Sequence, residues 1–284
     1  MELTNIGTIK ELFSRHGFSF TKSLGQNFLV NPAVCPKIAE QGGCNKNLCA
    51  LEIGTGIGVL TKELALRCKK VVAIEIDTGL KPILEETLSD FSNIEIIFAD
   101  FMETDLQKLF EEKFGGEEVV VCANLPYYIT SPVIMRLLEE KLPVKSITVM
   151  VQREAADRIC APMGSRDCGA LTAAVNYYST PKKLFNVSRG SFDPSPNVDS
   201  AVIRLDVVQN GKYKVEDEKL FFRIIRAAFS QRRKQMINPL SAELHIPKQK
   251  LAEIFEVAGI KAAARPEELS MEDFVRLCRE IGRL

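Results

Sequence analysis

The sequence lacks the residue patterns that build metal sites, disulfide frameworks and membrane spans. It has only two histidines, and none of its eight cysteines forms a Cys-x-x-Cys pair. These gaps argue against a zinc site and against a disulfide scaffold. No apolar run reaches membrane-spanning length, and the N-terminal segment lacks the apolar core of a signal peptide. We therefore expect a cytoplasmic protein without a bound metal.

The chain also lacks a net charge, because 37 basic residues balance 37 acidic ones. The two kinds of charge are unevenly distributed along it. Residues 1–180 carry 18 Lys+Arg and 23 Asp+Glu, whereas residues 181–284 carry 19 and 14. The C-terminal part therefore has a positive surplus, which favours contact with an anionic partner.

A strand, a glycine turn and a helix follow one another in the order that nucleotide-type cofactor sites require. Apolar residues 48–53 predict a buried strand, Gly54-Thr55-Gly56-Ile57-Gly58 a turn, and residues 59–67 a helix. Dinucleotide folds prefer G-x-G-x-x-G, but here the third glycine comes one position early, at Gly58. This spacing favours a ligand without phosphates, and S-adenosylmethionine fits.

Two acidic residues stand at the ends of the next two predicted strands. Glu75 ends the strand 71–76, at the distance from the first glycine where a carboxylate accepts ribose hydroxyls. Asp100 follows the strand 94–98 and is placed to accept an adenine amino group. The alternative is that each residue only caps the helix that follows it.

Asn124-Leu125-Pro126-Tyr127 follows a predicted strand at 119–123 and suits an aromatic amine substrate. The lone pair of adenine N6 is delocalised, so the amine attacks well only when acceptors hold its hydrogens. The Asn124 side-chain oxygen and a backbone carbonyl provide such acceptors. Pro126 stiffens the turn, and Tyr127 offers a face for base stacking. Cys122, just before the turn, is interpreted as a core residue of the strand.

At this point the sequence resembles the ribosomal RNA adenine N6,N6-dimethyltransferases, and within them the small-subunit (16S) enzymes. The matching segments span nearly the whole chain in the order of the family. They are Leu24-Gly25-Gln26-Asn27-Phe28-Leu29, Leu51-Glu52-Ile53-Gly54-Thr55-Gly56-Ile57-Gly58, Asn124-Leu125-Pro126-Tyr127, Phe192-Asp193-Pro194-Ser195-Pro196-Asn197-Val198-Asp199-Ser200 and Phe229-Ser230-Gln231-Arg232-Arg233-Lys234.

The resemblance implies roles for these residues. It implies that Tyr127 and Phe192 sandwich the target adenine, the catalytic set being Asn124, Leu125, Pro126, Tyr127 and Phe192. It also implies an S-adenosylmethionine pocket lined by Asn27, Leu29, Gly54, Gly56, Glu75, Asp100 and Asn124. The residues alone leave Phe192 open between a stacking platform and a core anchor, although Pro194 and Pro196 restrict the backbone around it.

Residues 219–242 contain six basic side chains and no acidic one. Phe221, Phe222, Ile225, Ala228 and Phe229 recur at helical spacing beside them. The pattern predicts an amphipathic helix with a basic flank for RNA phosphates. The predicted RNA-binding residues are Arg223, Arg226, Arg232, Arg233 and Lys234, with a solvated helix face as the alternative.

The remaining pattern alternates strands with helices and then becomes helical. We expect helices at 8–16, 132–141, 154–160 and 170–178, a strand at 146–151, and a final pair of strands at 184–187 and 200–208. The acidic stretch 111–118 is expected to be an exposed loop, and 209–212 a linker. The prediction is an α/β, Rossmann-like, seven-stranded S-adenosylmethionine-dependent methyltransferase domain at 1–209, followed by a small all-helical RNA-binding domain at 210–284.

The resemblance therefore implies an enzyme that dimethylates adenine N6 on two adjacent adenosines of small-subunit ribosomal RNA, and we expect it to be a monomer. Three alternatives stay open. One is a large-subunit methyltransferase of the antibiotic-resistance type, which shares the cofactor motifs. The second is a Rossmann oxidoreductase, disfavoured by Val59 in the glycine loop. The third is a non-catalytic assembly factor that binds RNA.

Overall fold

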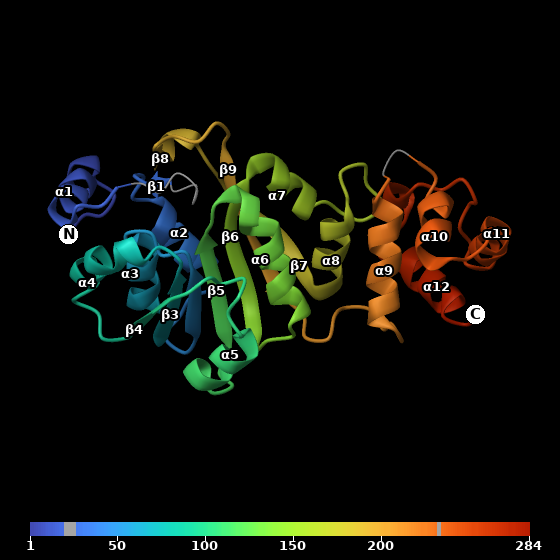
Figure 1. Ribbon diagram of the computed structural model, residues 1–284, viewed down its shortest axis with the longest axis horizontal. Helices are drawn as coiled ribbons and strands as arrows, with labels where there is room; N and C mark the ends of the chain where they lie inside the picture. Colours follow the sequence, from blue (N-terminus) through green and yellow to red (C-terminus); the bar gives the residue numbers. More distant parts are fainter. Residues whose placement is uncertain (20–26, 232–233) are drawn as a thin grey trace. The chain divides into compact units, whose positions relative to one another are not determined.

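A computed structural model describes residues 1–19, 27–231 and 234–284 (Figure 1). The chain forms two compact units. The first joins Met1–Ala156 to Lys182–Val207, and the second joins Asp157–Pro181 to Val208–Leu284. By packing, the segment 157–181 thus belongs with the C-terminal helices, although it precedes the expected boundary after residue 209. A functional division at 209/210 stays a prediction.

A seven-stranded sheet forms the centre of the first unit, as the sequence predicts. Its strand order is β4-β3-β2-β5-β6-β9-β7. The strands β2 to β6 run parallel, and β9 is antiparallel to β6. The strands of the chain are β1 Phe28–Leu29, β2 Cys49–Ile53, β3 Lys70–Glu75, β4 Ile94–Phe98, β5 Val119–Asn124, β6 Val144–Gln152, β7 Ser179–Val187, β8 Phe192–Asp193 and β9 Ser200–Val207.

Helices connect the parallel strands, and the helix α1 precedes them all. Asn5 caps α1 by accepting the N–H groups of Gly7 and Thr8, and Gly17 ends it in a left-handed conformation. The α-helices are α1 Ile6–His16, α2 Val34–Gln41, α3 Val59–Arg67, α4 Lys81–Thr87, α5 Leu106–Phe114, α6 Tyr127–Glu139, α7 Arg153–Ile159, α8 Ala170–Tyr178, α9 Glu218–Phe229, α10 Ile237–Leu244, α11 Lys248–Val257 and α12 Met271–Ile281.

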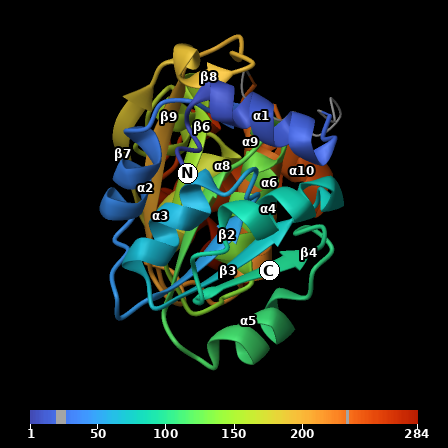
Figure 2. The same cartoon turned by 90° about the vertical axis from the view of Figure 1, so that its left-hand side faces the viewer.

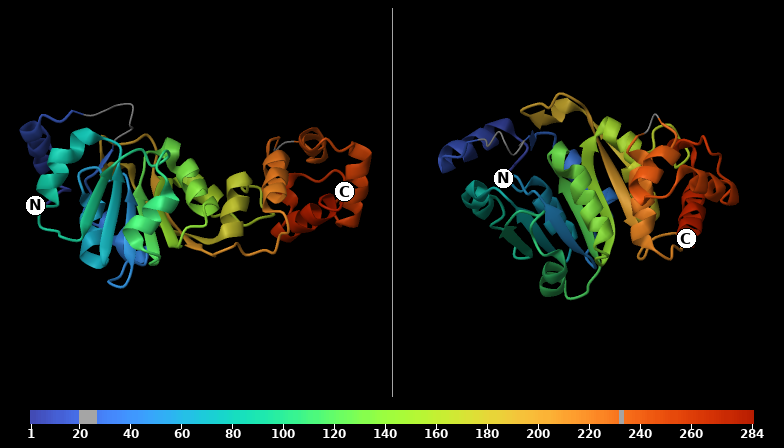
Figure 3. Two further views of the ribbon diagram at one scale, coloured as in Figure 1. Left: turned by 60° about the horizontal axis from the view of Figure 1, so that its bottom comes forward. Right: turned by 45° about the vertical axis from the view of Figure 1, so that its right-hand side comes forward.

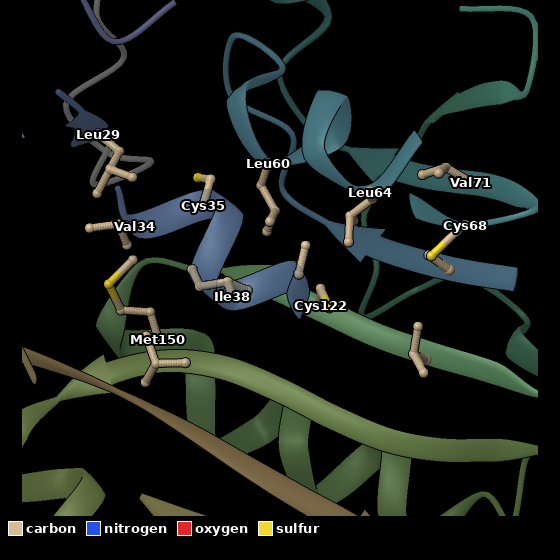
Figure 4. Packing of buried hydrophobic residues seen from close by; sticks show 14 of the residues in the cluster. Leu29, Val34, Cys35, Ile38, Leu60, Leu64, Cys68, Val71, Cys122 and Met150 are labelled. Atoms are coloured by element: carbon tan, nitrogen blue, oxygen red, sulfur yellow. The ribbon is translucent and has the colours of Figure 1, made fainter. Parts of the chain in front are cut away.

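The main core of the first unit lies between the sheet and the helices α2 and α3, which pack against each other (Figure 2). Ala50 and Val120, on neighbouring strands, point into it. Figure 4 shows side chains from both helices and from the sheet meeting there, among them Cys122. Cys122 is fully buried, which confirms its interpretation as a core residue.

Two expectations for the first unit are wrong. The acidic stretch 111–118 is not all loop, because α5 extends to Phe114, which is buried. Its Phe110 and Phe114 rings pack together, which explains why the helix continues among acidic residues. The helix expected at 132–141 begins earlier, at Tyr127. Pro132 lies inside α6, yet the helix accommodates it, so the proline does not mark the start of the helix.

The second unit contains α8 and the helices α9 to α12 (Figure 3). Tyr177 and Tyr178 of α8 pack against Phe221 and Phe222 of α9. The Tyr178 hydroxyl donates to Glu218 Oε1 at 2.6 Å. Burial raises the pKa of Tyr177 to about 12, and the Glu218 carboxylate adds to the rise. This aromatic cluster explains why the segment 157–181 packs with the C-terminal helices.

None of the helices in the described part of the chain combines the length and the apolar character needed to cross a bilayer.

Candidate active site

A pocket of about 290 Å³ opens at the carboxyl ends of the parallel strands of the first unit. The strand β2 lies there between β3 and β5, where the order of the sheet reverses, and open α/β sheets bind ligands at such points. All eleven residues predicted for catalysis and cofactor binding line this pocket. They are Asn27, Leu29, Gly54, Gly56, Glu75, Asp100, Asn124, Leu125, Pro126, Tyr127 and Phe192.

The glycine loop takes a backbone conformation that favours glycine. Gly54 has φ +76° and Gly58 has φ +90°, both in the left-handed region. A Cβ on Gly58 would also lie 3.0 Å from the Leu88 side chain. The third glycine therefore caps α3 and lets it pack closely against α4.

Glu75 holds the glycine loop in place from the end of β3. Its Oε2 accepts the Thr55 N–H at 2.8 Å, the Thr55 hydroxyl at 2.9 Å and the Gly56 N–H at 3.1 Å. Its Oε1 accepts the N–H of Asp77 at 2.9 Å. The side chain is only 5% exposed. Because a carboxylate oxygen can accept at least two hydrogen bonds and Oε1 accepts one from the described residues, Oε1 retains capacity for a ligand hydroxyl.

Asp100 follows β4 and closes a tight turn at the pocket wall. Its Oδ1 accepts the Met102 N–H at 2.7 Å, and its carbonyl oxygen accepts the Thr104 hydroxyl at 2.7 Å. Arg136 of α6 supports the same turn by donating to the carbonyl oxygens of Phe101 and Thr104. Its guanidinium also lies over the Phe101 ring, 5.5 Å from the ring centroid.

Glu52 lines the pocket beneath the glycine loop and was assigned no role by the sequence. The side chain is fully buried, and neither carboxyl oxygen has a hydrogen-bond partner among the described residues. Burial raises the pKa of this carboxyl well above its usual range, and the Glu75 charge adds to the rise. The Thr61 hydroxyl opposes the shift but makes no well-formed hydrogen bond, so burial dominates. A buried acid without a partner is a candidate ligand contact.

The turn predicted to be catalytic lines the same pocket as the residues predicted to bind the cofactor. Asn124 is the last residue of β5 and pairs with Met150 of β6. Tyr127 begins α6 directly after Pro126, and its hydroxyl forms a 2.7 Å hydrogen bond with the Ser200 hydroxyl of β9. Ser200 is fully buried, so the Tyr127 ring is anchored at its far end. The sequence assigns no role to Ser200. Its only relevant sequence feature is that it ends the motif that begins at Phe192.

Phe192 lies at the pocket wall and is only 6% exposed. It belongs to β8, which pairs antiparallel with β1, so that Leu29 lies opposite Phe192. The Val30 N–H also donates to the Ser191 carbonyl oxygen at 2.8 Å. The expected stacking residue and the expected cofactor residue Leu29 are therefore neighbours across a two-stranded sheet. The Asp193–Pro194 peptide bond that follows is cis.

The profile of the ribosomal RNA adenine dimethylase family matches residues 17–282 of this chain. The chain belongs to the ribosomal RNA adenine dimethylase family. This dimethylase is 46% identical over 275 residues to ribosomal RNA small subunit methyltransferase A of Alkaliphilus oremlandii, with 96% of each chain covered. It is also 46% identical over 280 residues to the protein of that name from Geobacillus thermodenitrificans, covering 97% of this chain and 96% of that one.

Two solved structures share its fold. A dimethyladenosine transferase from Plasmodium falciparum superposes with a TM-score of 0.77 at 26% identity, covering 90% of this chain and 98% of that one. The 23S rRNA methyltransferase ErmE superposes with a TM-score of 0.69 at 26% identity, covering 90% and 100%. The Rossmann-like methyltransferase fold and the enzyme class expected from the sequence are confirmed.

The basic segment of this dimethylase differs from expectation in two respects. The apolar stripe of α9 is buried, and Arg223 and Arg226 are exposed, as predicted. However, α9 ends at Phe229, where Ser230 bonds the Ala227 carbonyl oxygen, so Lys234 lies beyond the helix. Arg232 and Arg233 lie outside the described residues.

The basic segment 219–242 also has an acidic partner that lies just outside it in the sequence. Arg223 Nε lies 2.8 Å from Glu243 Oε1 of α10, and this hydrogen bond lowers the pKa of Glu243. Both side chains are about half exposed, so the pair contributes little to stability. It nevertheless partly neutralises Arg223 as a phosphate contact.

Proposed function

We propose that this dimethylase transfers methyl groups from S-adenosylmethionine to adenine N6, twice per base, on two adjacent adenosines of small-subunit ribosomal RNA, and thereby takes part in small-subunit biogenesis. The observation that carries the proposal is that one pocket joins the predicted cofactor residues to the Asn124–Tyr127 turn. We expect the enzyme to act as a monomer in the cytoplasm.

The pocket fits S-adenosylmethionine at both of its ends. Glu75 would accept a ribose hydroxyl through Oε1, and Asp100 would accept the adenine amino group. The orphaned Glu52 carboxyl would be satisfied by the α-ammonium group of the methionine end, which also favours its ionised form. Bound there, S-adenosylmethionine supplies an electrophilic methyl group on a positively charged sulfur.

The catalytic turn would prepare the nucleophile. The Asn124 side-chain oxygen and a backbone carbonyl of the turn hold the two N6 hydrogens, which keeps the lone pair directed at the methyl group. No strong base is needed before attack, because the nitrogen becomes acidic only after it is methylated. Positioning therefore supplies most of the acceleration, and oriented reactants can gain on the order of 7–11 kcal/mol in this way.

The target adenine would lie between Tyr127 and Phe192. Both rings line the pocket, and both are fixed from behind, Tyr127 by Ser200 and Phe192 by the β1–β8 pairing. A fixed ring loses little entropy when a base stacks on it. The base must leave its own stack to enter the pocket, as in other enzymes that modify bases.

The RNA outside the pocket would be held by Arg223, Arg226, Arg232, Arg233 and Lys234. Arg226 and Lys234 are exposed, and no ion pair to another described residue occupies either. Arg223 contributes less, because it is paired with Glu243.

The proposal is tested by incubating the protein with labelled S-adenosylmethionine and unmethylated small ribosomal subunits. Nucleoside mapping of the product should show N6,N6-dimethyladenosine at two adjacent positions. Large subunits serve as the control, because a large-subunit methyltransferase would carry the same cofactor motifs. Label that appears only in large subunits would support that alternative, and RNA binding without any label would support the assembly-factor alternative.

A further inference from the structure

Two consecutive tyrosines begin α6, and they differ sharply in their surroundings. Successive side chains of a helix point about 100° apart, so neighbours face different directions. Tyr127 is partly buried and bonded to Ser200. Tyr128 also lines the pocket, yet its side chain is 64% exposed. One tyrosine therefore belongs to the interior of the pocket and the other to its mouth.

Within the described part of the chain, the Tyr128 side chain makes no polar or ring contact that would explain its position. Neither a ring contact nor a hydrogen bond ties its side chain to any other described residue. An exposed aromatic ring beside a pocket is more often part of a binding surface than an exposed apolar residue elsewhere on the protein. The ring is therefore available to something that approaches the pocket from solvent.

Tyr128 differs in its place in the chain from the other exposed apolar side chains that line the pocket. Two other exposed apolar side chains line the same pocket, namely Ile76 at 50% and Met102 at 40%. Each of these closely follows an expected cofactor residue, Glu75 or Asp100. Tyr128 instead adjoins the Asn124–Tyr127 turn, which is the part of the pocket that the proposed function assigns to the RNA base.

On the proposed function, we infer that Tyr128 is a stacking platform for the nucleobase next to the target adenine. A base turned into the pocket remains joined to its neighbours through the sugar–phosphate chain. A neighbouring base is thereby held at the mouth, where it has lost its own stacking partner. An aromatic ring restores that stacking without reading the sequence, because every base has a π-face.

The test compares Tyr128→Ala with Tyr128→Phe in the full-length protein. The probe is an RNA hairpin that carries two adjacent adenosines in its loop, with saturating S-adenosylhomocysteine present. Two further hairpins carry an abasic nucleotide in place of one adenosine or the other. Fluorescence anisotropy measures each dissociation constant. Leu66→Ala on α3 is the matched control, because Leu66 is 50% exposed and does not line the pocket.

We expect Tyr128→Ala to weaken binding of the intact hairpin roughly 5- to 100-fold, the range that one stacked base gives. Tyr128→Phe and Leu66→Ala should bind like the wild type. The wild type should bind one of the two abasic hairpins more weakly than the intact hairpin, by the same factor. Tyr128→Ala should bind that abasic hairpin and the intact hairpin with equal affinity.

Other outcomes overturn the inference. Equal losses of affinity for all three hairpins in Tyr128→Ala would show that the ring stacks on neither base. Weaker binding of S-adenosylmethionine by Tyr128→Ala would show that the ring covers the cofactor. A different experiment tests the proposed function, which fails if the wild type forms no dimethyladenosine on small subunits. The two failures can be told apart, because the hairpin titration measures only RNA affinity.

Discussion

At the scale of single residues, the site depends on polar groups whose partners lie far away in sequence. Ser200 and Tyr127 are 73 positions apart, yet their hydroxyls lie 2.7 Å from each other. Glu75 and Thr55 are 20 positions apart, and Thr55 donates to Glu75 twice. The Tyr127 ring and the glycine loop are thus each fixed by a contact that only the folded sheet creates.

We predict that Ser200→Ala and Tyr127→Phe lower kcat/KM for RNA by similar factors. Each removes the same hydrogen bond, which contributes about 0.5–1.5 kcal/mol. The double variant should be no worse than either single one, and affinity for S-adenosylmethionine should be unchanged. Steady-state kinetics with RNA measures these effects.

The control for this pair is Ser146→Ala. Ser146 is equally buried and donates to the Gly42 carbonyl oxygen, but it does not line the pocket. It should lose stability without losing kcat/KM. Additive losses in the Ser200→Ala, Tyr127→Phe double variant would show that the two hydroxyls act separately.

The buried Glu52 predicts a pH-dependent cost of stability in the ligand-free protein. Its folded pKa is raised, so the unfolded chain ionises first as the pH rises above about 4.3. The contribution of Glu52 to the free energy of unfolding is therefore complete at acidic pH and is lost as the pH rises through the folded pKa. The total loss is about 1.4 kcal/mol for each pH unit that separates the folded pKa from the unfolded one.

Glu52→Gln should remove this loss. Urea denaturation should find the variant more stable than the wild type at pH 8, with the difference shrinking toward pH 4.5. Its affinity for S-adenosylmethionine should fall, because a neutral amide cannot pair with the ammonium group. A stability difference that does not change with pH would mean that Glu52 is ionised in the fold.

At the scale of helices and strands, the sequence predicts most of what positions the site. Apolar runs and helical spacing identify β4 and α3 at their observed bounds, and the ends of β2, β3 and β5 to within one residue. The start of α6 is missed, because Pro132 is read as a boundary. The β1–β8 pairing is also missed, since two-residue strands 163 positions apart leave no periodic signal.

Arg136 connects α6, which begins at Tyr127, to the turn that contains Asp100. Its planar guanidinium donates to two carbonyl oxygens at once, and Nε lies 2.6 Å from Glu140 Oε1. We predict that Arg136→Lys weakens S-adenosylmethionine binding roughly tenfold, because lysine cannot reproduce this fork. Isothermal titration with S-adenosylmethionine measures the effect.

Arg204→Lys is the matched control for Arg136→Lys. Arg204 also pairs with a carboxylate and donates to a carbonyl oxygen, that of Gln41, but it lies outside the pocket. If both variants bind the cofactor like the wild type, the Asp100 turn does not need Arg136.

At the scale of the whole molecule, each unit contains one of the two predicted binding regions. The first holds the pocket, and the second holds the basic segment 219–242, which includes most of α9. The sequence predicts this segment from its charge. It cannot show that Glu243 of α10 pairs with Arg223, because an acidic residue outside a basic stretch becomes a partner only through packing.

Reversing Arg232, Arg233 and Lys234 to glutamate should weaken RNA binding and flatten its salt dependence. The slope of log K against log salt should fall by about 0.7–0.9 for each phosphate that the protein no longer neutralises. Filter binding of small-subunit RNA at several salt concentrations measures this slope.

The control is the reversal of Lys248 and Lys250 on α11. Arg223→Ala should reduce RNA binding less than the removal of an unpaired arginine, because Arg223 is paired with Glu243. Equal slopes for wild type and the triple variant would exclude these residues from the interface.

The central claim is that the Asn124 turn makes adenine N6 nucleophilic beside a cofactor that binds independently of it. The most direct measurement is single-turnover methyl transfer by Asn124→Ala on unmethylated small subunits, paired with the dissociation constant for S-adenosylmethionine. We predict that transfer is abolished while much of the cofactor affinity remains. Near-normal dimethylation by this variant would contradict the claim.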